Sequence, residues 1–206
     1  MTYDVREELK PSNLNGISDD QINDHWGLYK GYVAQVNTLK AELAELRAAG
    51  KGDTLAYADR RRRMGFEFNG MVLHEYYFGN LATGSEKEEA QAFVDAVTEQ
   101  WGSFEQWAAD FSATGKSRSI GWAICAMDPV TGDINNHFIQ LHEEGNVASF
   151  HPLVVMDVWE HAYMVDHKAG GRGDYIGKFM SNINWRTVAQ RFAAAKEGAT
   201  SMRFAA

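Results

Sequence analysis

Asp157 and His161 stand four residues apart in the segment MDVWEHAY, directly after the apolar run PLVVM. This spacing can aim both side chains at one point, where a strand gives way to a turn or a helix. A carboxylate and an imidazole suit first-row metal ions, but two ligands alone hold such an ion loosely. A histidine near an aspartate often makes only a structural hydrogen bond. The pair therefore needs partners from elsewhere in the chain before it indicates a metal site.

Two further histidines, His25 and His74, lie among aromatic and small residues rather than on charged segments. His25 shares a helical stripe with Tyr29 and Tyr32, and His74 shares one with Gly70. Two antiparallel helices could bring both imidazoles together. The alternative is a pair of core histidines, because buried imidazoles readily find hydrogen-bond partners.

The elements that must position these side chains can be read from the hydrophobic spacing. Helices are expected over 19–49, with Ser18 as N-cap, and over 54–78, because apolar residues recur there at helical intervals without proline. Further along the chain we expect a linker at 80–85, two shorter helices at 86–102 and 103–115, a β-hairpin of 119–128 and 133–144, a third strand at 152–157 and a helical tail at 174–195.

These expectations define an α+β fold. An N-terminal antiparallel helical hairpin domain would span residues 1–84, and a C-terminal α/β domain would span 85–206. In the second domain, helices would flank a three-stranded antiparallel sheet.

The amino-acid composition limits the kinds of partner that the protein can bind. The chain of 206 residues carries 20 basic and 28 acidic side chains, a formal charge of −8, which argues against binding to nucleic acid or to an anionic membrane. The start MTYDVREELK is polar and acidic, unlike a secretory signal, so we expect a cytoplasmic protein. The single cysteine, Cys125, excludes an internal disulfide.

The motifs together resemble those of the iron/manganese superoxide dismutase family. DVWEHAY followed by GRGDYIGKFMSNINW is similar to its C-terminal signature, and GWAICAMDPVTG to its central hairpin. FNGMVLHEYYFGNL and INDHWGLYKGYVAQVN are similar to its two metal-bearing helices. The resemblance implies an enzyme that converts superoxide to dioxygen and hydrogen peroxide at one iron or manganese ion per chain. The ligands that it implies are His25, His74, Asp157 and His161.

The resemblance also assigns an outer-shell role to His142, in FIQLHEEGN. The family has a glutamine or a histidine there, which holds the metal's solvent ligand, and Gly70 would leave room for that side chain to come from the sheet. Family members with histidine in this role include several that use iron or accept either metal, so we favour iron. The alternative for His142 is an exposed histidine at a strand end.

The chain departs from the family where the substrate channel is gated. The family carries a histidine one turn after its first ligand and a tyrosine two turns after it, but Tyr29 and Val33 stand there. We expect Tyr32 to be the gate, with Tyr29 as its competitor. The resemblance further implies a homodimer, or a tetramer, with Glu160 at the interface, although Met164 replaces a tyrosine that is common there.

Two other functions compete with this one. The first is a metal-binding homologue of the same fold whose altered gate has changed or removed its redox activity. The second is a di-metal carboxylate oxidase, which would need Glu-x-x-His pairs on facing helices. The sequence contains no such pair.

Overall fold

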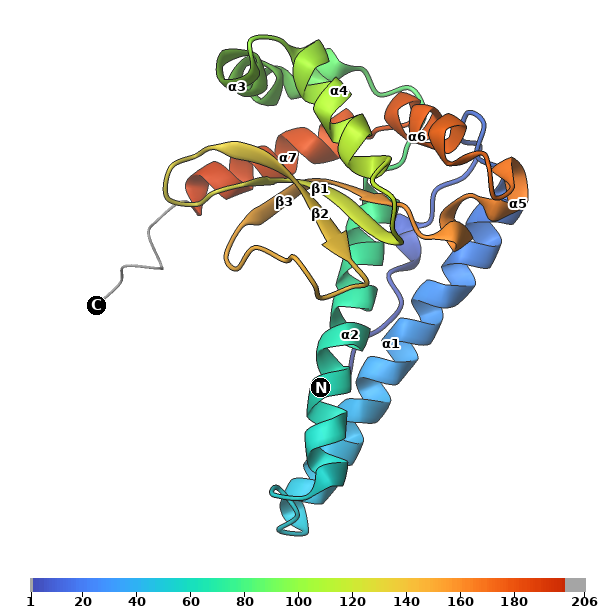
Figure 1. The fold of residues 1–206 in the computed structure, drawn as a ribbon, viewed down its shortest axis with the longest axis vertical. Helices are drawn as coiled ribbons and strands as arrows, with labels where there is room; N and C mark the ends of the chain where they lie inside the picture. The colour runs from blue at the N-terminus through green and yellow to red at the C-terminus, as the bar shows by residue number, and fades with distance from the viewer. Residues whose placement is uncertain (1, 199–206) are drawn as a thin grey trace.

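A long helical hairpin opens the chain, with α1 (Asp19–Ala48) and α2 (Leu55–Gly79) antiparallel and packed together (Figure 1). This computed structural model describes residues 2–198. Ser18 caps α1, because its hydroxyl accepts a hydrogen bond from the Gln21 amide over 3.0 Å. Thr54 caps α2 in the same way. Both expected helices are confirmed, and their far ends form an arm that projects from the rest of the molecule.

The remaining elements build a sheet with helices around it (Figure 1). They are α3 (Gln91–Trp101), α4 (Phe104–Gly115), β1 (Gly121–Met127), β2 (Ile134–Gln140), β3 (His151–Asp157), α5 (Met164–His167), α6 (Arg172–Ser181) and α7 (Trp185–Glu197), with short 3-10 turns at Glu7–Leu9, Lys87–Ala90 and Glu160–Ala162. The predicted α+β class and its antiparallel three-stranded sheet are confirmed.

The sheet has the order β2-β1-β3, so the third strand adds beside the first strand of the hairpin. Every residue of the central strand β1 is buried. Helix α4 packs against β1 and β2, whereas α2 packs against β3. The register places Trp122 of β1 opposite Asp157 at the end of β3. This pairing brings the aromatic side chain of Trp122 next to the candidate carboxylate.

The C-terminal tail differs from the single helical segment expected from its spacing. Asn182 is fully buried between α6 and α7, and its side-chain amide donates to the carbonyls of Lys178 and Asn15 over 2.7 and 2.9 Å. Asn184 then caps α7 by accepting from the Thr187 amide. The helix is interrupted here because the side chains of Asn182 and Asn184 hydrogen-bond to backbone groups. Such bonds compete with the backbone hydrogen bonds of a continuous helix.

Asn80 joins the helical hairpin to the sheet. Its side-chain oxygen accepts from the Val155 amide over 2.9 Å and from Nη1 of Arg191 over 2.7 Å, and its carbonyl accepts from the Asn184 amide. The buried apolar residues of both halves belong to one continuous cluster. The division at residue 84 stays a prediction. Within residues 2–198, no helix is long and apolar enough to cross a bilayer.

Candidate metal centre

Four side chains from distant parts of the sequence converge where the hairpin meets the sheet. They are His25 of α1, His74 of α2, Asp157 at the end of β3 and His161 in the turn that follows. Their candidate ligand atoms all lie within 4.8 Å of one another. The first three side chains are completely buried, and 23% of the His161 side chain is exposed.

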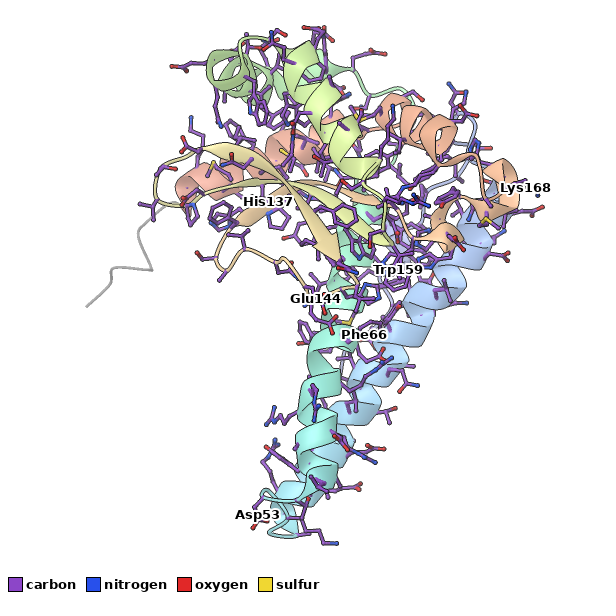
Figure 2. The ribbon with its side chains drawn as sticks, viewed as in Figure 1. Asp53, Phe66, His137, Glu144, Trp159 and Lys168 are labelled. Carbon is purple, nitrogen blue, oxygen red and sulfur yellow. The ribbon has the colours of Figure 1, made fainter. Side chains whose placement is uncertain are left out.

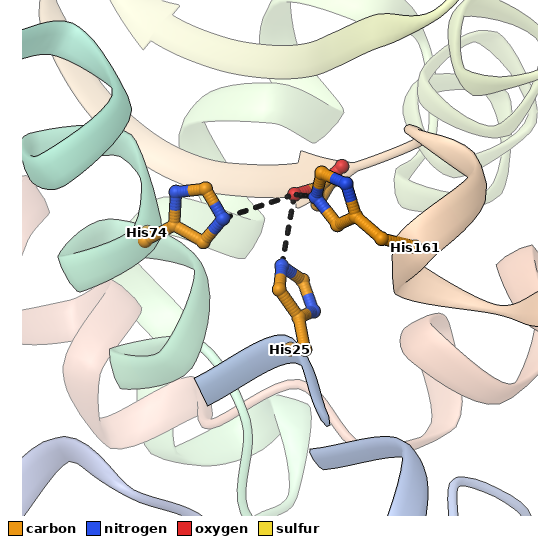
Figure 3. A group of neighbouring side chains, drawn as sticks. His25, His74 and His161 are labelled. Atoms are coloured by element: carbon orange, nitrogen blue, oxygen red, sulfur yellow. Dashed lines mark hydrogen bonds and ion pairs between the residues drawn. The ribbon is translucent and has the colours of Figure 1, made fainter. Parts of the chain in front are cut away.

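Figure 3 shows the three imidazoles converging on one carboxylate oxygen, and the contacts identify this atom as Oδ2 of Asp157. Nε2 of His25 lies 3.1 Å from it, and Nε2 of His161 lies 3.2 Å from it. Nε2 of His74 is 3.7 Å away. The arrangement places three imidazole nitrogens and one carboxylate oxygen around a single position.

The protonation of His74 follows from its backbone contact. Its Nδ1 lies 2.6 Å from the carbonyl oxygen of Gly70, which can only accept, so the proton is on Nδ1. Nε2 therefore carries a lone pair. That atom is buried and has no hydrogen-bond partner within the described chain. A buried nitrogen lone pair without a donor is costly, and a metal ion would satisfy it.

The charge of Asp157 fits the same interpretation. Burial would raise the pKa of its carboxyl group, but His161 and His25 outweigh burial and hold the pKa well below its usual range. Burial lowers the pKa values of His25 and His74, which keeps both imidazoles neutral. Imidazoles combined with one ionised carboxylate suit iron and manganese ions, so the residues present fit such an ion.

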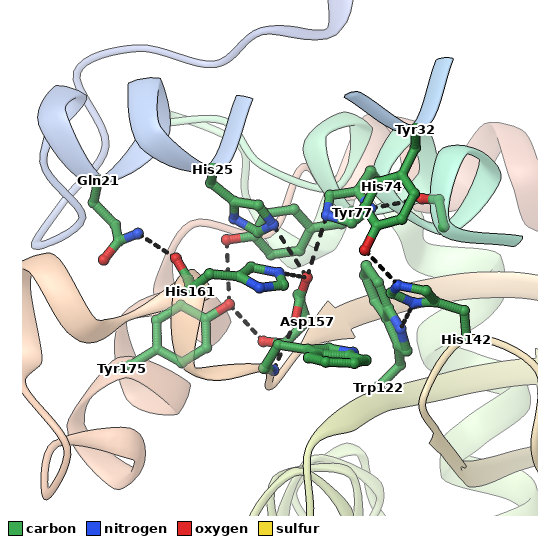
Figure 4. Close-up of polar contacts among 12 residues, drawn as sticks. Gln21, His25, Tyr32, His74, Tyr77, Trp122, His142, Asp157, His161 and Tyr175 are labelled. Atoms are coloured by element: carbon green, nitrogen blue, oxygen red, sulfur yellow. Dashed lines mark hydrogen bonds and ion pairs between the residues drawn. The ribbon is translucent and has the colours of Figure 1, made fainter. Parts of the chain in front are cut away.

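Backbone and side-chain contacts hold the two C-terminal residues of this group in place (Figure 4). The Trp159 amide donates to Oδ1 of Asp157 over 2.8 Å, which leaves Oδ2 for the centre. The Tyr175 hydroxyl donates to the Asp157 carbonyl over 2.8 Å. Nε2 of Gln21 donates to the His161 carbonyl over 2.6 Å. Such contacts orient ligands before an ion arrives.

Gln21 belongs to this support, although it was not among the predicted site residues. Gln21 lies one helical turn before His25, and only 1% of its surface is exposed. Its side chain also accepts from the Val165 amide over 3.0 Å. A polar residue on the otherwise apolar buried face of a helix is the signal that could have revealed it.

His142 lies beside this group and is completely buried. Its Nε2 is 2.7 Å from the Tyr32 hydroxyl, and its Nδ1 accepts from the Trp122 indole over 3.0 Å (Figure 4). The aromatic rings of Phe66 and Trp159 contact the imidazole at centroid distances of 4.4 and 5.0 Å. The alternative of an exposed histidine is therefore wrong.

The position of His142 in the fold also differs from the expectation. We expected a strand through residue 144, but β2 ends at Gln140 and His142 lies in the turn that follows. Leu141 adopts a positive φ of 53°, which ends the strand and redirects the chain. Figure 2 shows Phe66 on α2, Glu144 in this turn and Trp159 after β3, all in the region where the arm joins the sheet.

The space at Gly70 is filled by Tyr32. A Cβ atom at Gly70 would lie 2.6 Å from a ring carbon of Tyr32, which is too close for two non-bonded carbon atoms. The Tyr32 ring also packs on His74, with centroids 5.1 Å apart. The missing side chain of Gly70 thus leaves room for a tyrosine from α1, whereas we expected it to leave room for a residue from the sheet.

Tyr29, the competing candidate for the gate, lies in the packed interior. Its hydroxyl donates to the Glu75 carboxylate over 3.0 Å and accepts from the Arg6 amide over 3.1 Å. Burial raises the pKa of Tyr29 to about 12. Its hydrogen-bonding groups are committed within the chain, which favours Tyr32 over Tyr29 as the gate.

Comparison with known proteins agrees with this geometry. Residues 89–191 match the family model described as iron/manganese superoxide dismutases, C-terminal domain. An iron superoxide dismutase of Aquifex aeolicus is 34% identical over 203 residues, covering 96% of this chain and 94% of that protein. One from Cupriavidus metallidurans is 33% identical, covering 95% of this chain and 98% of that protein.

A manganese enzyme is also among the relatives. Superoxide dismutase [Mn] 2 of Haloferax volcanii is 30% identical over 182 residues, covering 88% of this chain and 89% of that protein. Relatives that differ in their metal therefore resemble the chain over most of its length, and the chain belongs to the iron/manganese superoxide dismutase family.

Proposed function

We propose that this protein is a superoxide dismutase that holds one iron or manganese ion through His25, His74, Asp157 and His161. The observation that carries the proposal is the convergence of these four side chains within 4.8 Å, with Nε2 of His74 buried and unpartnered within the described residues. When bound, the ion supplies one-electron redox chemistry, by which one superoxide is oxidised to dioxygen and a second is reduced to hydrogen peroxide.

The side chains around the ligands have two tasks. They exclude bulk water, since Trp122, Tyr77 and Phe78 are almost completely buried beside the imidazoles. They also supply hydrogen bonds, because each peroxide formed requires two protons. Tyr32 and His142 are suited to this second task, because the hydrogen bond between their side chains lies directly beside His74.

We favour iron as the metal in this protein. Iron and manganese share the same ligand types and differ through tuning by neighbouring groups and through supply. A histidine in the position of His142, together with two similar relatives named as iron enzymes, supports this choice.

We further propose a homodimer, or a tetramer, with Glu160 at the interface. Glu160 is exposed beside His161, the one candidate ligand that reaches the surface. Met164 and Val165 are more than one-third exposed a few residues further on, which adds apolar surface to this face. Superoxide is the proposed substrate, and a cytoplasmic location stays a prediction.

Metal analysis and an activity assay on the same purified sample test the proposal. We expect about one iron or manganese ion per chain, since four ligands define a mononuclear site, together with catalysed loss of superoxide. Full occupancy by zinc, with no activity after reloading with iron or manganese, would refute it. Bound iron or manganese without dismutation would instead identify a homologue with altered redox activity.

A further inference from the structure

Arg191, near the middle of α7, is a largely buried arginine without an acidic partner. Among residues 2–198 its guanidinium forms no ion pair with a carboxylate, whereas Arg186 of the same helix pairs with Glu89 over 3.3 Å. Burial lowers the pKa of Arg191 to about 10, so the group is still charged at pH 7. A charge that is withdrawn from water without a counter-ion is costly, and an anion would offset this cost.

Three of the five N–H groups of this guanidinium are bonded to uncharged oxygen atoms of the chain. Nη1 donates to Oδ1 of Asn80 over 2.7 Å and to the Leu153 carbonyl over 3.3 Å, and Nη2 donates to the Tyr76 carbonyl over 3.1 Å. One N–H of Nη2 and the N–H of Nε remain. Two such nitrogens of the planar group can bind two oxygens of one phosphate or carboxylate.

The Arg191 side chain lines a surface cavity of about 350 Å³ between the segment before α1, the end of α2 and the start of α7. Thr187 and Gln190 also line it, and neither side chain has a hydrogen-bond partner among residues 2–198. The remaining lining residues are Glu8, Leu9, Lys10, Pro11, Phe78, Gly79, Leu81 and Asn184. The cavity thus offers a guanidinium, a hydroxyl and an amide to the same ligand.

The charges around this cavity favour an anion. Lys10 adds a second positive charge, and it is exposed. Glu8 is the acidic residue of the lining, but its Oε1 accepts from Nε of Arg6 over 2.9 Å. The negative charge is therefore balanced by a residue that does not line the cavity, whereas the charge of Arg191 is not balanced.

The start of α7 does not contribute its backbone. The Trp185 amide donates to Oγ of Ser85 over 2.9 Å, and the Thr187 amide donates to Oδ1 of Asn184 over 3.3 Å. These amides are already capped, so recognition of an anion depends on the side chains.

Gly79 keeps the space beside the guanidinium open. A Cβ atom at this position would lie 3.0 Å from Nη2 of Arg191 and 3.7 Å from Cδ2 of Leu9. The last residue of α2 thus leaves room next to a nitrogen that still has a hydrogen to donate.

We propose that this cavity binds a small oxyanion, a phosphate or a carboxylate, with Arg191 as its main contact and Lys10 and Thr187 as further contacts. None of the four candidate metal ligands lines the cavity, so the site is separate from the metal centre. Arg191 already joins α7 to α2 and β3 through the Tyr76 and Leu153 carbonyls. A bound anion therefore stabilises the junction between the helical hairpin and the sheet.

Calorimetric titration and thermal unfolding of the metal-loaded protein test the site, with inorganic phosphate and acetate as the two probes. Sodium chloride replaces each probe at equal ionic strength, so that the screening of surface charges is constant. We expect saturable binding and a rise in Tm with at least one probe, and the stronger response distinguishes phosphate from carboxylate. The absence of saturable binding with both probes would overturn the inference.

Two variants locate the site without removing the arginine. Gly79→Ala places a methyl group against Nη2 and should weaken binding about 10- to 100-fold, the usual effect of losing a hydrogen bond to a charged group. Lys10→Gln should weaken binding about two- to fivefold, because exposed charges interact weakly. Unchanged affinity in both variants would place the bound anion elsewhere and contradict the inference.

Arg191→Lys keeps the positive charge and loses the fork of N–H groups, so it should abolish measurable binding. Its matched control is Arg186→Lys, which alters an arginine of the same helix that has a carboxylate partner and should bind as the parent does. Equal losses in these two variants would indicate a general effect of charge on α7 and would also refute the site. If Arg191→Lys does not fold, Gly79→Ala and Lys10→Gln still decide the question.

Discussion

Nδ1 of His74 donates to the carbonyl oxygen of Gly70 over 2.6 Å, so the preceding turn of α2 sets the orientation of this imidazole. Because Gly70 has no side chain, it also leaves room for the Tyr32 ring. One residue thus positions both a candidate metal ligand and the tyrosine beside it. Backbone contacts of this kind prepare a site before any ion is present.

We expect Asp157→Ala and His161→Ala to abolish metal retention, because each removes a ligand atom from the buried group. His142→Ala should keep the metal and lose most of the turnover, since its contacts are with Tyr32 and Trp122. Metal content after dialysis, measured beside activity, distinguishes these outcomes. His137→Ala, on β2 and outside the group, is the matched histidine control. A silent His142→Ala variant would remove the role assigned to His142.

The two tyrosines should differ when their hydroxyls are removed. Tyr32→Phe should lower turnover at high superoxide, where proton delivery limits the rate, and leave metal content unchanged. Pulse-radiolysis kinetics of the purified variant measure this effect. The opposite pattern, with turnover lost only in Tyr29→Phe, would identify Tyr29 as the gate.

Tyr29→Phe should instead affect stability. It removes a donor to Glu75 and an acceptor for the Arg6 amide, which should cost about 1–3 kcal/mol in the free energy of unfolding. Chemical denaturation should be combined with sizing of the variant, because a tyrosine that paired across a subunit interface would change the assembly instead. A change of assembly without loss of stability would show that Tyr29 acts at such an interface.

Much of this arrangement could be predicted from the sequence. The two long helices follow from apolar spacing and from the caps Ser18 and Thr54, which are local signals. The resemblance of the motifs to those of a known family implied the four candidate ligands. The Tyr32–His142 bond could not be predicted from spacing, because it depends on a turn after β2 and on space at Gly70. Asn182 divides the tail for a similar reason, since its partner Asn15 is distant in sequence.

Asn80 should be important for stability rather than for chemistry. Asn80→Ala would leave the Val155 amide without its acceptor and would remove one of the acceptors of the Arg191 guanidinium, which should cost about 2–4 kcal/mol. Thermal unfolding of the metal-loaded variant measures this loss. Asn37, which is partly exposed and pairs with the backbone of Tyr3, provides the control Asn37→Ala. Equal shifts in Tm for the two variants would contradict the role of Asn80.

Cys125 should resist alkylation in the folded protein. Burial raises the pKa of its thiol to about 12, so the thiol stays protonated at pH 8 and the reactive thiolate is scarce. Reactivity should appear only above that pKa or on unfolding. Mass spectrometry after treatment with iodoacetamide, with and without guanidinium chloride, tests this. Rapid labelling of the folded protein at pH 8 would show that the strand opens.

The burial of the ligand group has a consequence for how the metal is acquired. Three of the four side chains are completely enclosed, and they come from the helical hairpin and from the sheet. We expect an ion to enter or leave when these parts separate, so metal exchange should be slow in the folded protein. The metal found in the mature protein would then record which ion was abundant while the chain folded, rather than which ion binds more tightly at equilibrium.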